Sequence, residues 1–153
     1  MSNVLGGLHR GDHFNIVFSL ALKIIKVNDR VPMEKIVITF IVPAVSPLLS
    51  KDWSADCLYL SQTIASIYNS NDSRYRLIVV GHEAPDFQMP SDERFKFIQV
   101  DFEPPSSRTY YNCVRDKFAK VDMGWRYAKQ HWKSDYVMIV DSDDFISCRL
   151  VSW

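Results

Sequence analysis

The stretch YVMIVDSDD, residues 136–144, joins a short apolar run to three carboxylates. Its first five residues have the length and the β-branched character of a buried strand. Asp141, Asp143 and Asp144 follow directly. In open α/β sheets, ligands bind beyond the carboxyl ends of the strands. The stretch therefore predicts a buried strand that brings acidic side chains to the ligand-binding edge of a sheet.

The segments before this stretch alternate between strand and helix patterns. Apolar runs predict strands at about 36–42, 76–81, 95–100 and 136–140. Apolar positions spaced three and four apart predict helices at about 55–68, with Ser54 as its N-cap, and at about 114–132. This alternation predicts an α/β fold, with a Rossmann-like, mostly parallel sheet flanked by helices.

The composition excludes several classes of protein. The 153 residues include 18 Lys and Arg and 18 Asp and Glu, so no net charge draws the chain to nucleic acid or to a membrane surface. Cys57, Cys113 and Cys148 are odd in number and form no CxxC pair, which argues against a disulfide framework and a zinc site. They fit a reducing compartment, and we expect a cytoplasmic protein.

Residues 1–32 differ in character from residues 33–153, which we interpret as the main domain. The apolar run at 14–27 is interrupted by Lys23 and Lys26 and is too short for a membrane span of about 20 residues. Met33 resembles a natural start just before the first sheet strand. Residues 1–32 are interpreted either as a poorly packed extension or as a surface amphipathic helix.

Three nearby carboxylates need a chemical explanation. Close like charges raise one another's pKa, and a hard divalent cation such as Mg²⁺ or Mn²⁺ resolves the conflict through oxygen ligands shared with phosphates. The alternative is that Asp and Ser merely begin a turn, with Ser147 capping a following helix.

Other metal and phosphate motifs do not fit. An EF-hand loop counted from Asp141 would need an oxygen ligand at Phe145 and a glycine at Ile146. The sequence contains neither a GxxxxGK[ST] motif nor a GxGxxG after an early strand. A haloacid-dehalogenase-like phosphatase carries D-x-D-G-T on an early strand, whereas Asp144 and Phe145 follow here, late in the chain.

The order of these features resembles the nucleotide-binding half of a GT-A fold glycosyltransferase of the family 2 type. A strand ending in FIVP, a helix, a strand ending near acidic residues, a long basic helix and an apolar strand with DSDD span Lys35 to Leu150. The resemblance implies a nucleotide-sugar donor, a divalent metal (Mn²⁺ or Mg²⁺) that bridges its diphosphate, and transfer of the sugar to an acceptor hydroxyl.

The resemblance also implies roles for the acidic residues. Asp141 matches the first aspartate of the family's D-x-D, which contacts the donor ribose and sometimes the metal through water. Asp143 matches the second, the direct metal ligand. Asp144 matches the next acidic position, which fixes the loop or approaches the sugar.

The resemblance to the family is weaker at positions outside the D-x-D motif. Val42 and Pro43 match the end of the first strand, where backbone groups meet the nucleotide base. Glu83 is the one acidic candidate where the family has a pair at the end of its second strand. Lys120 matches the basic residue of the long helix. Gly124 matches the glycine of its N-x-G, which a close approach of sheet or ligand, or a packing contact, would explain.

Lys117 lies on the same helical face as Lys120 and Gly124. It also lies near the helix start, where a cation is unfavourable for the helix dipole. A nearby diphosphate would explain it, and so would simple solvent exposure.

An enzyme of this family needs a region after the D-x-D that supplies the acceptor pocket and usually the catalytic base. FISCRLVSW, residues 145–153, is expected to form the first turns of the helix after the metal loop. We therefore expect a truncated, inactive donor-binding half, in which no base can be assigned. The alternative is a non-catalytic α/β module whose strand-end aspartates only cap a turn.

Overall fold

The computed structural model describes Lys23–Lys26 and residues 38–153. Its elements follow the predicted alternation of strands and helices. They are, in chain order, β1 (Lys23–Lys26), β2 (Ile38–Pro43), α1 (Trp53–Tyr68), β3 (Tyr75–Gly81), β4 (Phe95–Gln99), α2 (Tyr110–His131) and β5 (Tyr136–Ile139).

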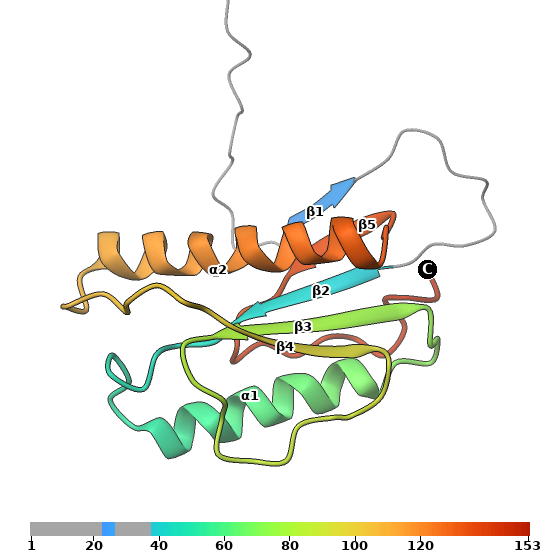
Figure 1. Ribbon diagram of the computed structural model, residues 1–153. Helices are drawn as coiled ribbons and strands as arrows, with labels where there is room; N and C mark the ends of the chain where they lie inside the picture. Colours follow the sequence, from blue (N-terminus) through green and yellow to red (C-terminus); the bar gives the residue numbers. More distant parts are fainter. Residues whose placement is uncertain (1–22, 27–37) are drawn as a thin grey trace, which may run out of the picture.

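The strands form one sheet in the order β1-β5-β2-β3-β4. β5, β2, β3 and β4 run parallel, and β1 pairs antiparallel to β5 at one edge (Figure 1). The predicted α/β fold with a mostly parallel sheet is confirmed, and all four predicted strands lie in it. None of the helices in the described part of the chain is long and apolar enough to cross a membrane.

The two helices cover opposite faces of the sheet, with α2 above and α1 below in Figure 1. Neighbouring residues of β2 alternate between them: Phe40 and Val42 belong to the core cluster on the α1 face, and Ile41 to the cluster on the α2 face. All three are fully buried. A strand covered on both faces needs a nearly continuous apolar run. ITFIVP provides one that is interrupted by Thr39, whose buried hydroxyl forms a hydrogen bond with Ser134.

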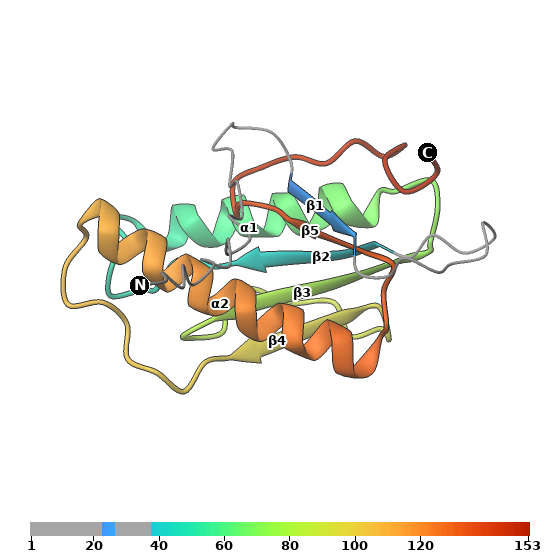
Figure 2. The same ribbon diagram turned by 90° about the horizontal axis from the view of Figure 1, so that it is seen from above.

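The connections create a switch point between β2 and β5. From β2 the chain continues through α1 to β3 and then β4 on one side, and α2 returns it to β5 on the other side of β2 (Figure 2). At the carboxyl ends of β2 and β5 the following loops therefore diverge, which is where α/β sheets bind ligands. The acidic turn, Asp141–Asp144, follows β5 at this place.

Both helices begin earlier than predicted, and Ser54 is not the N-cap of the first. Asp52 caps α1, because its carboxylate accepts from Ala55 N at 3.0 Å. α2 begins after Thr109, whose hydroxyl accepts from Asn112 N at 3.3 Å. The first residues of α2 include Tyr110, which is exposed, so the apolar stripe did not reveal them.

The prediction of a helix for residues 145–153 is wrong. This segment forms turns and irregular structure that run back beside α1. The C-terminus therefore lies at the end of the sheet where β2 begins, opposite the end that carries the acidic turn (Figure 1). Ile146 and Val151 are buried in the core cluster on the α1 face. The reason lies in the tertiary structure, because α1 and the turn after it form hydrogen bonds with the backbone of this segment.

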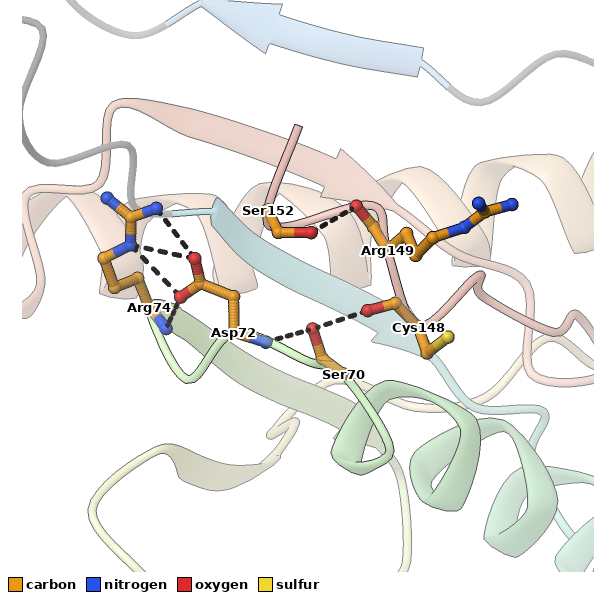
Figure 3. Close-up of polar contacts among 6 residues, drawn as sticks. All are labelled: Ser70, Asp72, Arg74, Cys148, Arg149 and Ser152. Atoms are coloured by element: carbon orange, nitrogen blue, oxygen red, sulfur yellow. Dashed lines mark hydrogen bonds and ion pairs between the residues drawn. The ribbon is translucent and has the colours of Figure 1, made fainter.

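Those partners are shown in part in Figure 3. The Cys148 carbonyl accepts from the Asn71 amide at 2.8 Å and from the Ser70 hydroxyl at 3.4 Å. Ser70 also accepts from the Asp72 amide, and Asp72 forms an ion pair with Arg74 at 2.7 Å. The turn between α1 and β3 thus holds the C-terminal segment in place.

The N-terminal region is described only at β1, where Lys23 pairs with Ile139 and Lys26 with Tyr136. The alternative of a surface helix does not hold for these four residues, because they extend the sheet. The rest of residues 1–32 lies outside the described residues, and its interpretation as an extension stays a prediction.

Gly124 lets α2 approach the sheet closely. A Cβ atom at this position would lie 2.7 Å from Ile41 Cγ2 and 3.3 Å from Val80 Cγ2. The sheet therefore approaches the glycine closely, and the approach is a packing contact with side chains of β2 and β3. Lys117 and Lys120 lie on the same face of α2, beside the carboxyl ends of the strands.

Replacement of Gly124 by valine should destabilise the protein by about 2 kcal/mol or more, because the new side chain overlaps the β2 and β3 side chains. Gln130→Val is the matched control, since Gln130 is exposed on the same helix. It should cost less than about 1 kcal/mol, from helix propensity alone. Urea unfolding measures both, and equal effects would contradict the close approach.

Replacement of Val151 by alanine should cost about 2 kcal/mol, from lost transfer free energy and the cavity left behind. Trp153→Ala should have no measurable effect, because the Trp153 side chain is fully exposed. A thermal or urea unfolding series on the two variants tests this. If Val151→Ala is as harmless as Trp153→Ala, the C-terminal segment does not belong to the core.

Candidate functional site

A depression of about 210 Å³ lies at the switch point, and we call it the switch-point depression. Its walls are the end of β2 with the loop that follows, one face of α2, and the acidic turn after β5. The residues that line it are Pro43, Ala44, Val45, Leu49, Cys113, Asp116, Lys117, Lys120, Asp141, Ser142 and Asp143.

The acidic turn is held by backbone groups and hydroxyls. Asp144 N donates to the Asp141 carbonyl at 3.1 Å, which closes the turn. From α1, the Thr63 hydroxyl donates to the Ser142 carbonyl at 3.0 Å, and the Ser66 hydroxyl accepts from Ile146 N at 3.1 Å. Within the described turn itself, no aspartate side chain accepts from the backbone, so the three carboxylates are not needed to close the turn.

Ser147 does not cap a helix, because none follows it in the described chain. Its hydroxyl accepts only the amide of Arg149, at 3.4 Å, as in a local turn. This part of the alternative interpretation is wrong.

Lys117 and Asp141 form an ion pair across the switch-point depression, from α2 to the acidic turn. The side chains are 39% and 50% exposed. Solvent screens such a pair, so it contributes at most about 1 kcal/mol to stability. The pair can therefore exchange its partners when another charged group arrives.

Lys120 is held in a very different way. Its side chain is 1% exposed, and Nζ donates to the Ala44 carbonyl at 2.9 Å and to Asp116 Oδ2 at 2.5 Å. Burial lowers the pKa of Lys120 below its usual value, and the hydrogen bond to Asp116 opposes that shift. The ammonium is thus fixed at the end of β2.

Asp116 joins Lys120 to a third element. Its other oxygen, Oδ1, accepts from His82 Nε2 at 2.8 Å, since a carboxylate can only accept. His82 follows β3, and its ring meets Phe102 edge to face with centroids 5.3 Å apart. One buried carboxylate therefore ties α2 to the loops after β2 and β3.

Sequence reasoning missed Asp116 and assigned no role to His82. The signal for Asp116 was its position four residues before Lys120, where opposite charges meet on one helical face. For His82 the signal was its place at a strand end. Neither signal shows that the two side chains meet, because that contact spans 34 residues of sequence.

The predicted site residues fall into two groups. Pro43, Lys120, Asp141 and Asp143 are brought together in the lining of the switch-point depression. The others lie apart from it. Val42 is buried in the core on the α1 face, and Glu83 and Asp144 are exposed outside the lining.

The donor set limits the kind of metal site that the chain can form. Among the described residues, no group of three or more His, Cys, Asp and Glu side chains is placed to hold a metal ion. Asp141 and Asp143 supply two carboxylates to the depression. Mg²⁺ commonly binds through one or two carboxylates together with substrate phosphates. The residues therefore fit a metal that is shared with a bound phosphate and that the protein alone binds more weakly.

A larger hollow of about 470 Å³ adjoins the switch-point depression and shares Asp116 with it. It lies between the loop after β4 and the first turns of α2, and Phe102, Pro104 and Arg115 are among its lining residues. Both hollows lie along the N-terminal half of α2.

Comparisons of the chain with models of known protein families, with curated proteins and with solved structures gave no match. The class of protein that the structure defines is an α/β domain with a concave region at the switch point of a mostly parallel sheet. The glycosyltransferase resemblance stays a prediction from the sequence.

Removal of the Asp116 carboxylate should destabilise the fold by roughly 3–5 kcal/mol, because Asp116→Ala leaves the buried Lys120 ammonium without its ion-pair partner. Asp122→Ala is the matched control, since Asp122 pairs with Arg126 at the same i, i+4 spacing on the solvent face of α2. It should cost less than about 1 kcal/mol. Urea unfolding at neutral pH measures both, and similar losses would contradict the anchoring role of Asp116.

Proposed function

We propose that this chain binds a nucleotide-sugar donor, as the donor-binding part of a glycosyltransferase that transfers the sugar to an acceptor hydroxyl. The observation that carries the proposal is the meeting of two lysines of α2 with two carboxylates of the acidic turn at the switch point. This combination of charges suits a diphosphate with a divalent cation.

The charges explain why both kinds of residue are needed. Asp141 and Asp143 repel a diphosphate unless a cation lies between them and the phosphates. Lys117 and Lys120 attract the phosphates directly. When bound, a divalent ion neutralises the diphosphate and stabilises it as a leaving group.

The size of the site fits part of the donor. The switch-point depression, at about 210 Å³, is smaller than the roughly 300–1,000 Å³ typical of small-molecule sites. It has room for a diphosphate, while the adjoining hollow of about 470 Å³ offers space for another part of the ligand.

The proposed roles follow the family resemblance. Asp143 is the metal ligand, and Asp141 contacts the ribose or the metal. The backbone near Pro43 meets the base. Lys120 is a fixed cation for the phosphates, because its ammonium is anchored on Ala44 and Asp116.

Two predicted site residues lie outside the depression, and the catalytic base is not assigned. Asp144 and Glu83 are exposed near the strand ends and would contact the ligand only beyond the lining of the depression. No described residue is assigned as the base that would deprotonate the acceptor.

The alternative function is a non-catalytic α/β module in which the aspartates only shape a turn. The acidic turn closes through the Asp144 amide and is anchored by the hydroxyls of Thr63 and Ser66. Its carboxylates are not needed for that geometry, which favours donor binding over the alternative.

Calorimetry with uridine and guanosine diphosphates should show weak binding that depends on Mn²⁺ or Mg²⁺ and is lost on addition of a chelator. Asp143→Asn should abolish the metal-dependent binding, because it removes the proposed direct ligand. Asp144→Asn should reduce it less, since Asp144 lies outside the lining.

Asp101→Asn is the matched control, because Asp101 is an exposed carboxylate close to the end of β4 that lines neither hollow. It should leave binding unchanged. Binding that ignores chelator, or that survives Asp143→Asn, would remove the acidic turn from the site. Asp143→Asn that alters only the unfolding free energy would favour the alternative module.

A further inference from the structure

The two lysines of the switch-point depression differ in their freedom to change partners. Lys120 is buried and bonded to a backbone carbonyl and to Asp116. Lys117 is more exposed, and its ammonium contacts Asp141 Oδ1 in the acidic turn. Only Lys117 can therefore leave its carboxylate without breaking buried contacts.

The Lys117 ammonium occupies an oxygen that a divalent cation would need. We infer that Lys117 is the resident counter-cation of Asp141, that a divalent metal ion competes with it for this carboxylate, and that the displaced ammonium binds the phosphate of the ligand. This inference rests on the proposed function, because it concerns the same site.

The charges in the lining support the exchange. Asp116, Asp141 and Asp143 carry three negative charges and Lys117 and Lys120 two positive ones, so these side chains nearly neutralise one another. A divalent ion at Asp141 would lie beside the Lys117 ammonium and repel it. A diphosphate that arrives with the metal gives the ammonium a new partner of opposite charge.

The strength of the ion pair sets the size of the effect. A half-exposed pair is worth at most about a factor of five in an equilibrium constant. Loss of the Lys117 charge also removes its repulsion of the metal ion. Without nucleotide, we expect Mn²⁺ to bind the Lys117→Met variant roughly three- to tenfold more tightly than the wild type.

The same substitution should act in the opposite direction on the nucleotide. In saturating Mn²⁺, uridine diphosphate should bind Lys117→Met roughly five- to tenfold more weakly, because one phosphate contact is lost. A purely structural role of Lys117 would weaken both ligands together. Opposite signs for metal and nucleotide are therefore the signature of the exchange.

The experiment is a titration of the full chain with Mn²⁺, followed by electron paramagnetic resonance of the free ion, and then calorimetry with uridine diphosphate. Lys129→Met is the matched control, because it removes one charge from the solvent-exposed part of α2 and lines neither hollow. It should change neither affinity. Lys117→Arg keeps the charge and should keep Mn²⁺ affinity close to wild type, even if the methionine variant proves unstable.

A double variant tests whether the change in Mn²⁺ affinity depends on Asp141. The gain in Mn²⁺ affinity from Lys117→Met should shrink in the background of Asp141→Asn, because the ion pair no longer exists there and only the loss of charge repulsion remains. A gain as large as in the wild-type background would overturn the inference.

The outcomes separate this inference from the function that it rests on. If the wild type binds Mn²⁺ and uridine diphosphate but Lys117→Met leaves Mn²⁺ affinity unchanged or weaker, the counter-cation role is wrong and donor binding stands. If the wild type binds neither ligand, both proposals fall.

Discussion

The burial of β2 on both faces is the constraint from which the rest of the structure follows. Phe40 and Val42 must be covered on one side and Ile41 on the other. One helix cannot do both, so the chain places α1 below the sheet and α2 above it. With one crossover helix on each face, β3 and β4 lie on one side of β2 and β5 lies on its other side. The switch point and its depression are consequences of that path.

The close contact at Gly124 sets the position of α2 over the sheet, and with it the position of the two lysines of the site. Because α2 lies against Ile41 and Val80 there, the same face one and two turns earlier lies over the carboxyl ends of the strands. Lys120 and Lys117 occupy those turns. Asp116 then pins the helix through Lys120 and His82. Packing in the middle of α2 and a buried charge network near its start thus act together to orient the lysines.

The charges of the site combine a rigid part with an exchangeable part. The network of His82, Asp116 and Lys120 is buried, where removal of one partner is costly. The pair of Lys117 and Asp141 is half exposed, where exchange is cheap in free energy. A site that must admit a charged ligand and release it benefits from both, since the rigid part keeps the geometry and the exposed part adapts.

Several features could not be predicted because their causes are not local. An apolar stripe reveals the part of a helix that packs, so it missed the exposed start of α2 at Tyr110. The residues after the acidic turn contain spaced apolar side chains, but they pack against the α1 face instead of forming a helix. The strand at Lys23–Lys26 depends on β5 as its partner, which lies more than a hundred residues away in sequence.

The sequence by itself determined the α/β class, the four parallel strands and the acidic turn, since strand and helix periods and the run of aspartates are local patterns. It also singled out Lys120 and Gly124 as one face of a helix. Only the tertiary structure decided that His82 donates a hydrogen bond to Asp116, that Lys117 neutralises Asp141, and that Glu83 and Val42 lie away from the depression. These relations depend on which loops the sheet order brings together, and hydrogen bonds and ion pairs act only over a few ångströms.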